Sequence, residues 1–125
     1  MSVLSYRIKI RGSRGQNKYE ALFDSGASDS MIRSDLVDDL EVATNLPEPI
    51  SYETATEDEH ITVNKAVGLD FYIDGIRLRD EFLVVENLSE EVIIGASTMQ
   101  KCRMKLNFEE DRVMVDPRIM RKILK

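Results

Sequence analysis

Apolar and polar residues alternate with a period of two along most of this chain. In the first segment Leu4, Tyr6, Ile8 and Ile10 share one face, and the polar residues between them share the other. A strand that is half buried in a sheet has this pattern, whereas an amphipathic helix repeats its apolar residues every three or four positions. The chain is therefore predicted to be mainly β.

Turn-forming residues separate the alternating segments. The polar, glycine-containing stretch 12–17 ends the first strand, and Asp74-Gly75 predicts a type I′ hairpin because both residues tolerate positive φ. Residues 50–64 are predicted to form two arms around a charged tip, Glu57 to His60. The remaining strands are predicted at 4–11, 18–23, 63–73, 76–85, 92–94, 104–108 and 112–115.

Three short helices are predicted between these strands. Ser34 is a candidate N-cap for a helix through Leu40, and a second helix is predicted from Ser97 to Arg103. Asp116-Pro117 would open a terminal helix, with Asp as N-cap and Pro at the first helical position. Its apolar face would carry Ile119, Met120, Ile123 and Leu124. Pro47 and Pro49 are expected to interrupt regular structure.

Together these elements predict one small domain over residues 1–125, a β-barrel or folded sheet. A chain of 125 residues buries enough surface for a core without a disulfide or metal. Cys102 and His60 are the only cysteine and the only histidine, whereas a structural zinc site needs about four such ligands. No metal and no cofactor are therefore predicted.

Charge and hydropathy argue against two classes of partner, nucleic acids and membranes. The net charge of −6 argues against a nucleic-acid surface, which would be basic. No apolar run approaches the roughly 20 residues of a membrane span, and the first residues lack the apolar core of a signal peptide. We therefore expect a cytoplasmic protein with no membrane partner. The basic residues near both ends of the chain are interpreted as lying on solvent-exposed faces of strands and helices. The alternative is that they bind an acidic partner.

One carboxylate occupies an unusual position. Ala21-Leu22-Phe23 is an apolar strand that ends in Asp24 and is turned at once by Ser25-Gly26. A carboxylate held there is poorly solvated, as an acid/base catalyst requires. No other Asp-Ser-Gly or Asp-Thr-Gly occurs in the chain. If two such carboxylates are needed, the second must come from another copy of the chain.

The segment from Glu20 to Ile32, followed by Ile93-Ile94-Gly95 and then Leu106-Asn107-Phe108, resembles the retroviral-type aspartic proteases, the retropepsins. The resemblance covers roughly residues 6 to 108. It implies a closed β-barrel monomer that acts as a homodimer, with one Asp24 from each chain at the interface. The implied activity is that of an aspartic endopeptidase acting on a peptide or protein substrate.

The resemblance also implies roles for individual residues. Asp24 would be catalytic, and Gly26 would allow close backbone approach. The Ser25 hydroxyl would hydrogen-bond the partner's backbone across the interface, with capping of its own turn as the alternative. Residues 50–64 would form the flap that closes over the substrate. Substrate would be contacted by Ala27, Ser28, Asp29, Thr54, Ala55, Thr56 and Ile93.

The chain departs from the retroviral pattern at several points. The flap tip has no glycine and carries three carboxylates, which are interpreted as a solvated loop with weak calcium binding as the alternative. Ser28 and Ala96 replace an Asp and an Arg that pair beside the retroviral active site. The dimer is expected to close differently, through the 104–115 hairpin and the terminal helix, unless these belong to the core of one chain. Glu90 and Glu91 are either exposed turn residues or the source of a tolerance for Lys or Arg in substrates.

Two other interpretations of the sequence, in which the protein is not a protease, remain open. The first is an inactive dimerisation or peptide-binding module that has kept the fold. Asp24 argues against it, since a buried carboxylate costs stability and is easily lost once chemistry is no longer needed. The second is an unrelated small β-barrel, which would leave the Ile93-Ile94-Gly95 segment as a coincidence.

Overall fold

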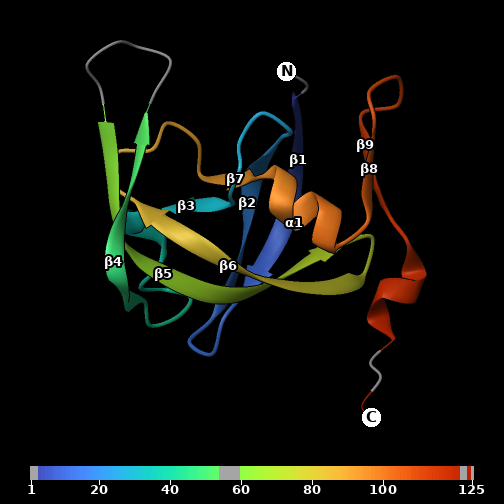
Figure 1. Cartoon of the computed structure of the whole chain (residues 1–125). Helices are drawn as coiled ribbons and strands as arrows, with labels where there is room; N and C mark the ends of the chain where they lie inside the picture. Colours follow the sequence, from blue (N-terminus) through green and yellow to red (C-terminus); the bar gives the residue numbers. More distant parts are fainter. Residues whose placement is uncertain (1–2, 54–59, 122–123, 125) are drawn as a thin grey trace.

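The structure, a computed structural model, describes residues 3–53, 60–121 and 124 and is mainly β (Figure 1). It contains three short helices: the 3-10 helix η1 (Ser34–Leu36), the α-helix α1 (Ala96–Lys101) and the 3-10 helix η2 (Pro117–Met120). The strands are β1 (Val3–Arg11), β2 (Gln16–Asp24), β3 (Met31–Arg33), β4 (Thr44–Glu53), β5 (His60–Ile73), β6 (Ile76–Val85), β7 (Val92–Ile94), β8 (Met104–Asn107) and β9 (Arg112–Val115).

Six of these strands close into a barrel in the order β1-β2-β7-β3-β6-β5. The barrel closes because β1 pairs with β2 along its whole length and also with β5, where Lys9 to Arg11 lie opposite Tyr72 to Asp70. The β2–β7 and β3–β6 pairs are parallel, and the other pairs in the barrel are antiparallel. Strand β4 lies outside the barrel order and, among the strands that the structure describes, pairs with β5 alone. The predicted closed β-barrel is thus confirmed.

The barrel interior is filled by the apolar face of each strand. Ile10, Phe23, Leu69, Phe71 and Phe82 have no exposed surface. The rings of Phe71 and Phe82 meet edge to face, with centroids 5.7 Å apart and planes at 87°. Because side chains fill the interior, a substrate must bind at the barrel's end or outer surface.

Both predicted hairpin turns are confirmed. Asp74 and Gly75 have φ of 51° and 78°, as a type I′ turn requires. Strands β8 and β9 pair from Met104–Val115 to Asn107–Arg112 around a tight turn in which Asp111 has φ of 51°. The described parts of residues 50–64 also pair as two arms, with Glu53 opposite His60. Residues 54–59, the predicted tip, lie outside the described residues.

The prediction that Pro47 and Pro49 interrupt regular structure is wrong in part. Both lie within β4, and their effect is a shift in the pairing with β5 between Asn45 and Ile50. An edge strand tolerates proline because one side of its backbone has no ladder to complete.

Two of the helix predictions are also wrong. Ser34 is the first residue of the three-residue η1, not its N-cap, and no side-chain cap bond forms at Arg33, which pairs with Asp35 at 2.7 Å instead. Asp116 does cap η2 by accepting the N–H of Arg118 at 3.0 Å, but Arg121 is already extended. The helix η2 therefore ends at Met120, short of Leu124, which is 98% exposed.

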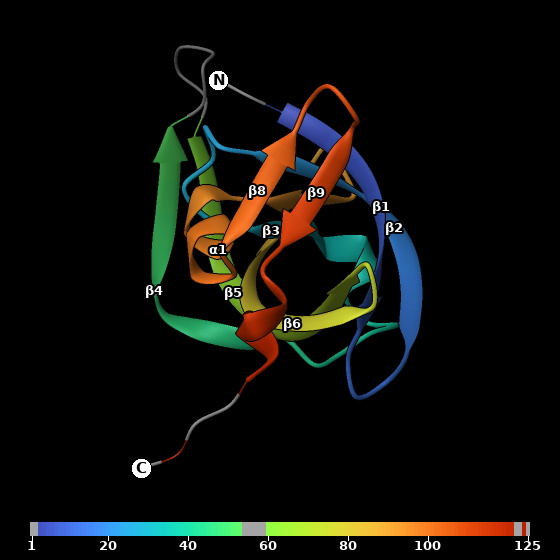
Figure 2. The same ribbon diagram turned by 90° about the vertical axis from the view of Figure 1, so that its right-hand side faces the viewer.

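The loop after β2, the paired arms of β4 and β5, and the turn between β8 and β9 all lie toward one end of the barrel (Figure 1). The β8–β9 hairpin crosses the side of the barrel next to α1 (Figure 2). Val113 of β9 is fully buried in the main core, so this hairpin contributes to the core of one chain. Among the described residues, no helix has both the length and the apolar character needed to cross a membrane.

We predict that Leu69→Ala destabilises the protein by about 3 to 5 kcal/mol, because it leaves a cavity in a filled barrel. Leu124→Ala is the matched control, since Leu69 has no exposed surface and Leu124 is almost fully exposed. Urea unfolding followed by circular dichroism measures both. Equal small losses for the two variants would contradict a packed barrel interior.

Candidate active site

Asp24 is the last residue of β2, and its carboxylate is half-buried beside the turn that follows. The N–H of Gly26 donates to Asp24 Oδ1 at 2.8 Å, and the N–H of Ala27 donates to the carbonyl of Asp24 at 3.1 Å. The turn therefore fixes the carboxylate from its own backbone. A fixed carboxylate that remains accessible at a strand end can exchange protons with a bound molecule.

Three consecutive amides hold the loop from Asp24 to Ser30 in place. The N–H of Gly95 donates to Ser30 Oγ at 3.0 Å. The N–H groups of Ala96 and Ser97 donate to the carbonyls of Ala27 and Ser28 at 2.7 and 3.1 Å. The first N–H groups of a helix have no partner within it, so the start of α1 is satisfied by this loop. We call these three hydrogen bonds the loop–helix clamp.

A chain of buried polar side chains continues from the clamp. Ser30 and Thr98 are almost fully buried, and their hydroxyl oxygens are 2.5 Å apart. Thr98 Oγ1 donates its one proton to Asp80 Oδ2 at 2.7 Å, so Ser30 must be the donor to Thr98. Lys101 Nζ lies 3.2 Å from the other carboxylate oxygen of Asp80. The carboxylate of Asp80 on β6 thus orients the Thr98 hydroxyl directly and the Ser30 hydroxyl through Thr98.

The clamp depends on the absence of a side chain at residue 95. A Cβ placed on Gly95 would lie 2.5 Å from the carbonyl oxygen of Asp29 and 2.6 Å from its carbonyl carbon. Both atoms belong to the backbone, which cannot move aside without displacing the loop. The strand β7 and the loop after β2 therefore approach as closely as they do because residue 95 is glycine.

Tyr52 connects the flap arm to the same loop. Its hydroxyl donates to Asp29 Oδ2 at 2.5 Å. Burial of the ring raises the pKa of Tyr52 above its ordinary value, and the hydrogen bond to Asp29 and its negative charge act in the same direction. Tyr52 therefore keeps its proton, and β4 is attached to the loop that begins at Asp24.

The structure brings most of the predicted site residues together. Ser25 and Gly26 are exposed at the tip of the turn, and Ala27, Ser28 and Asp29 follow within the clamped loop. Ile93 is half-buried in β7, and its register partners are Leu22 of β2 and Met31 of β3. Thr54, Ala55 and Thr56 lie outside the described residues.

The structure also shows residues that the sequence did not indicate. Ser30, Thr98 and Asp80 form the buried chain behind the loop, but as single polar residues in separate segments they carry no local sequence signal. Ser28 and Ala96, which replace the retroviral ion pair, lie in segments that are joined by backbone hydrogen bonds instead. Glu91 has a structural contact, since its Oε1 accepts the N–H of Glu20 at 2.9 Å.

Comparison with known proteins identifies the family of this chain. The family model described as Ty3 transposon peptidase matches residues 4–109, which include the Asp24 loop, β7 and the clamp. The chain belongs to the Ty3 transposon peptidase family. The retropepsin resemblance is therefore confirmed. No curated protein sequence matches the chain.

Solved structures show the same fold at low sequence identity. The retroviral protease-like domain of Ddi1 from Leishmania major is 17% identical, with a TM-score of 0.65 and a match over 93% of this chain and 90% of that one. EIAV protease, solved in complex with the inhibitor HBY-793, is 14% identical, with a TM-score of 0.58 over 86% of this chain and 94% of that one. At these low identities the two matches show a shared fold and no more.

We predict that Gly95→Ala lowers the free energy of unfolding by about 1 to 3 kcal/mol, because the new methyl group collides with the backbone of Asp29. Gly68→Ala is the control, since its Cβ would meet only the flexible guanidinium of Arg79, 2.9 Å away. Urea unfolding is expected to show a change within about 0.5 kcal/mol for the control. A Gly95→Ala protein as stable as the control would contradict the close approach.

We predict that Tyr52→Phe costs about 1 kcal/mol of stability below pH 10, because a hydrogen bond to a carboxylate is lost from a half-exposed site. The folded pKa of Tyr52 is raised, so the stabilisation is fully present below the unfolded pKa near 10 and disappears as pH rises through the folded value. Urea unfolding at several pH values measures the difference between the two proteins. Tyr72→Phe, which removes a hydroxyl and keeps the ring, serves as the control. A difference that grows above pH 10 would contradict the assigned bond.

Proposed function

We propose that this protein is an aspartic endopeptidase that acts as a homodimer, with one Asp24 from each chain forming the catalytic pair. The observation that carries the proposal is the position of Asp24, held at the end of β2 in a loop clamped by β7 and α1. Membership of a peptidase family supports it. One chain supplies one such carboxylate, so the second must come from a second copy.

The chemistry follows from the proximity of two carboxylates. When both lie within a few ångströms they cannot both ionise at low cost, so they share one proton and titrate as a coupled pair. The ionised carboxylate removes a proton from a bound water, which attacks the peptide carbonyl. The protonated carboxylate donates to the carbonyl oxygen, and a proton then passes to the leaving amine as the C–N bond breaks.

Exposed apolar side chains support a dimer at the end of the barrel that carries Asp24. Val3 lies opposite Asp24 in the β1–β2 register and is 45% exposed. Phe108, which follows β8, is 48% exposed. Burial of such side chains against a second copy would favour association. Ser25, at the tip of the turn, is the residue expected to hydrogen-bond the partner's backbone.

The arms of β4 and β5 would form one side of the cleft. Because β4 is the edge strand of the sheet among the described strands, the backbone N–H and C=O groups of its outer edge would be accessible near the cleft. An extended peptide bound beside Ala27, Ser28 and Asp29 would make main-chain hydrogen bonds as an added strand. Thr54, Ala55 and Thr56 of the flap are proposed to contact it from above.

We predict that Asp24→Asn reduces peptide cleavage by about 10² to 10⁴-fold or more, because an amide cannot accept a proton from water. The assay is cleavage of an unbiased peptide pool by mass spectrometry between about pH 4 and 7, the range in which a coupled carboxylate pair shares a proton. Asp38→Asn, which alters an exposed carboxylate between η1 and β4, is the control and is expected to retain activity.

Analytical ultracentrifugation of the same proteins tests the dimer. A wild-type protein that is a folded dimer and cleaves nothing would favour the inactive peptide-binding module instead. A protein that remains monomeric at high concentration would contradict a catalytic pair built from two chains.

A further inference from the structure

A pocket of about 190 Å³ lies beside the active-site loop. Its volume is below the roughly 300 to 1,000 Å³ of sites for drug-sized ligands, so it suits a single side chain. Three elements form it, namely the loop after β2, the flap arm β4 and the strand β6. Its lining includes Asp29, Ser30, Ile50, Asp80, Glu81 and Leu83.

The walls of this pocket are partly apolar. Ile50 of β4 is 38% exposed, although a large aliphatic side chain is normally covered. Leu83 of β6 lines the same pocket and packs in the smaller core cluster with Val63 and Val85. A ligand that passes between Ile50 and Leu83 must therefore present methylene groups to them.

The polar part of the pocket carries an excess of negative charge. Asp80 is compensated by Lys101 at 3.2 Å. Asp29 accepts the neutral hydroxyl of Tyr52. Neither Asp29 nor the exposed Glu81 has an ion-pair partner within the described parts of the chain. Among the described residues, two of the three carboxylates are thus without an ion-pair partner.

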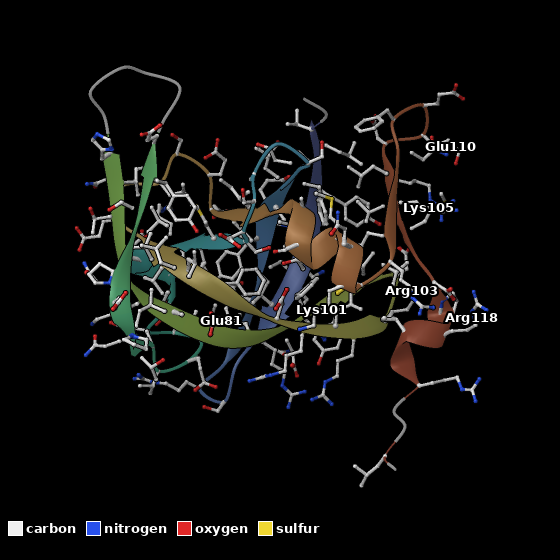
Figure 3. All side chains as sticks on the ribbon, in the orientation of Figure 1. Glu81, Lys101, Arg103, Lys105, Glu110 and Arg118 are labelled. Carbon is white, nitrogen blue, oxygen red and sulfur yellow. The ribbon has the colours of Figure 1, made fainter. Side chains whose placement is uncertain are left out.

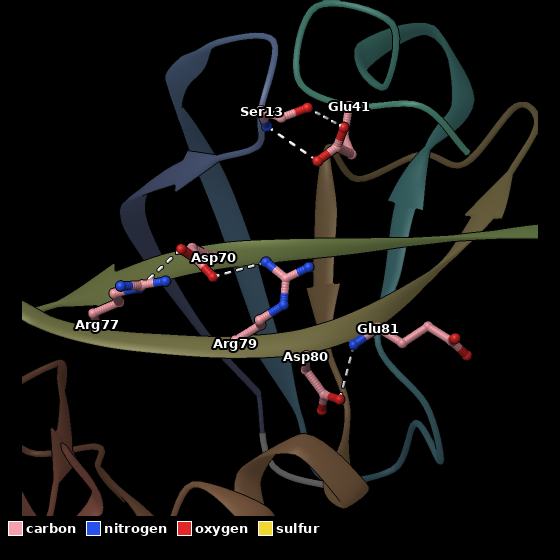
Figure 4. A network of polar contacts seen from close by, with 7 residues as sticks. All are labelled: Ser13, Glu41, Asp70, Arg77, Arg79, Asp80 and Glu81. Atoms are coloured by element: carbon pink, nitrogen blue, oxygen red, sulfur yellow. Dashed lines mark hydrogen bonds and ion pairs between the residues drawn. The ribbon is translucent and has the colours of Figure 1, made fainter. Parts of the chain in front are cut away.

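The arrangement of β6 keeps these carboxylates apart. The backbone N–H of Glu81 donates to Asp80 Oδ1 at 2.8 Å, and the Glu81 side chain extends away from Asp80 (Figure 4). Glu81 and Lys101 lie apart in Figure 3, and they form no ion pair within the described residues, although both line a larger neighbouring pocket with Arg79. A cationic ligand would therefore meet a pocket lined by Asp29, Asp80 and Glu81, of which only Asp80 has an ion-pair partner among the described residues.

We propose that this pocket selects a lysine or arginine side chain of the substrate, at a position flanking the scissile bond. This inference rests on the proposed endopeptidase function. Lysine and arginine combine an aliphatic stem, which Ile50 and Leu83 would cover, with a cationic head, which Glu81 and Asp29 would bind. An acidic substrate side chain at the same position would be repelled by both carboxylates. The two-fold symmetry of the dimer provides one such pocket on each side of the scissile bond.

The test uses peptide pairs that are identical except for Lys or Met at one flanking position, scanned along a sequence taken from the peptide pool. Wild-type protein is expected to cleave the Lys peptide with a kcat/KM about 3 to 10-fold higher at one position, as an ion pair at a partly exposed site allows. Glu81→Gln and Asp29→Asn are each expected to reduce this ratio, and the double variant to bring it near one. Added salt is expected to lower the wild-type ratio as well.

Glu86→Gln is the matched control, because Glu86 is an exposed glutamate just beyond the end of β6 and does not line this pocket. Its Lys-to-Met ratio should equal that of the wild type. The same peptide pairs are also titrated onto the Asp24→Asn protein by fluorescence anisotropy. This second readout measures binding without depending on cleavage.

The outcomes separate the two proposals. Cleavage without a preference for Lys, or with a preference that survives the double variant, overturns the pocket assignment and leaves the endopeptidase intact. Tighter binding of the Lys peptide without any cleavage, lost in the double variant, supports the pocket and overturns the endopeptidase. A protein that neither cleaves nor binds these peptides overturns both.

Discussion

The close approach of Gly95 to the backbone of Asp29 is the constraint on which the rest of the site depends. It brings the start of α1 against the loop after β2, so three amides of residues 95–97 can donate into that loop. A loop held through main-chain atoms loses little entropy when a ligand binds, because its conformation is already determined. The carboxylate of Asp24 is held in one position as well, because it accepts the N–H of Gly26 in the turn that begins the loop.

The chain of polar side chains behind the loop connects the loop to strand β6. Ser30 accepts from Gly95 and donates toward Thr98, which donates to Asp80 on β6. Buried hydroxyls with every partner satisfied fix a single arrangement of the segments that carry them. Asp80 therefore has two roles: it accepts the hydrogen bond of Thr98 behind the clamp, and it lines the pocket that contains Asp29 and Glu81. A chain that lacks the retroviral ion pair between residues 28 and 96 uses these backbone and hydroxyl contacts instead.

Much of the fold was predictable, and each error has its own physical cause. Period-two alternation located β1, β2, β5 and β6, and the Asp74-Gly75 turn followed from the preference of those residues for positive φ. Strand β3 was missed because Met31-Ile32-Arg33 has one β-branched residue, whereas the equally short β7 has three. The first half of β4 was missed because its two prolines suggest a break, although its second half was predicted as an arm of the 50–64 hairpin. The terminal helix was overestimated because its apolar spacing does not by itself provide a surface to cover it.

The sequence by itself determined the β class, the hairpin turns and the position of Asp24 at the end of an apolar strand. These depend on side-chain alternation and on local backbone preferences, which act over a few residues. Only the tertiary structure decided that Gly95 meets Asp29, that Tyr52 binds the same residue, and that Asp29 and Glu81 line one pocket with Ile50. Each of these contacts joins segments far apart in the chain, and the strand order β7-β3-β6-β5-β4 brings them together.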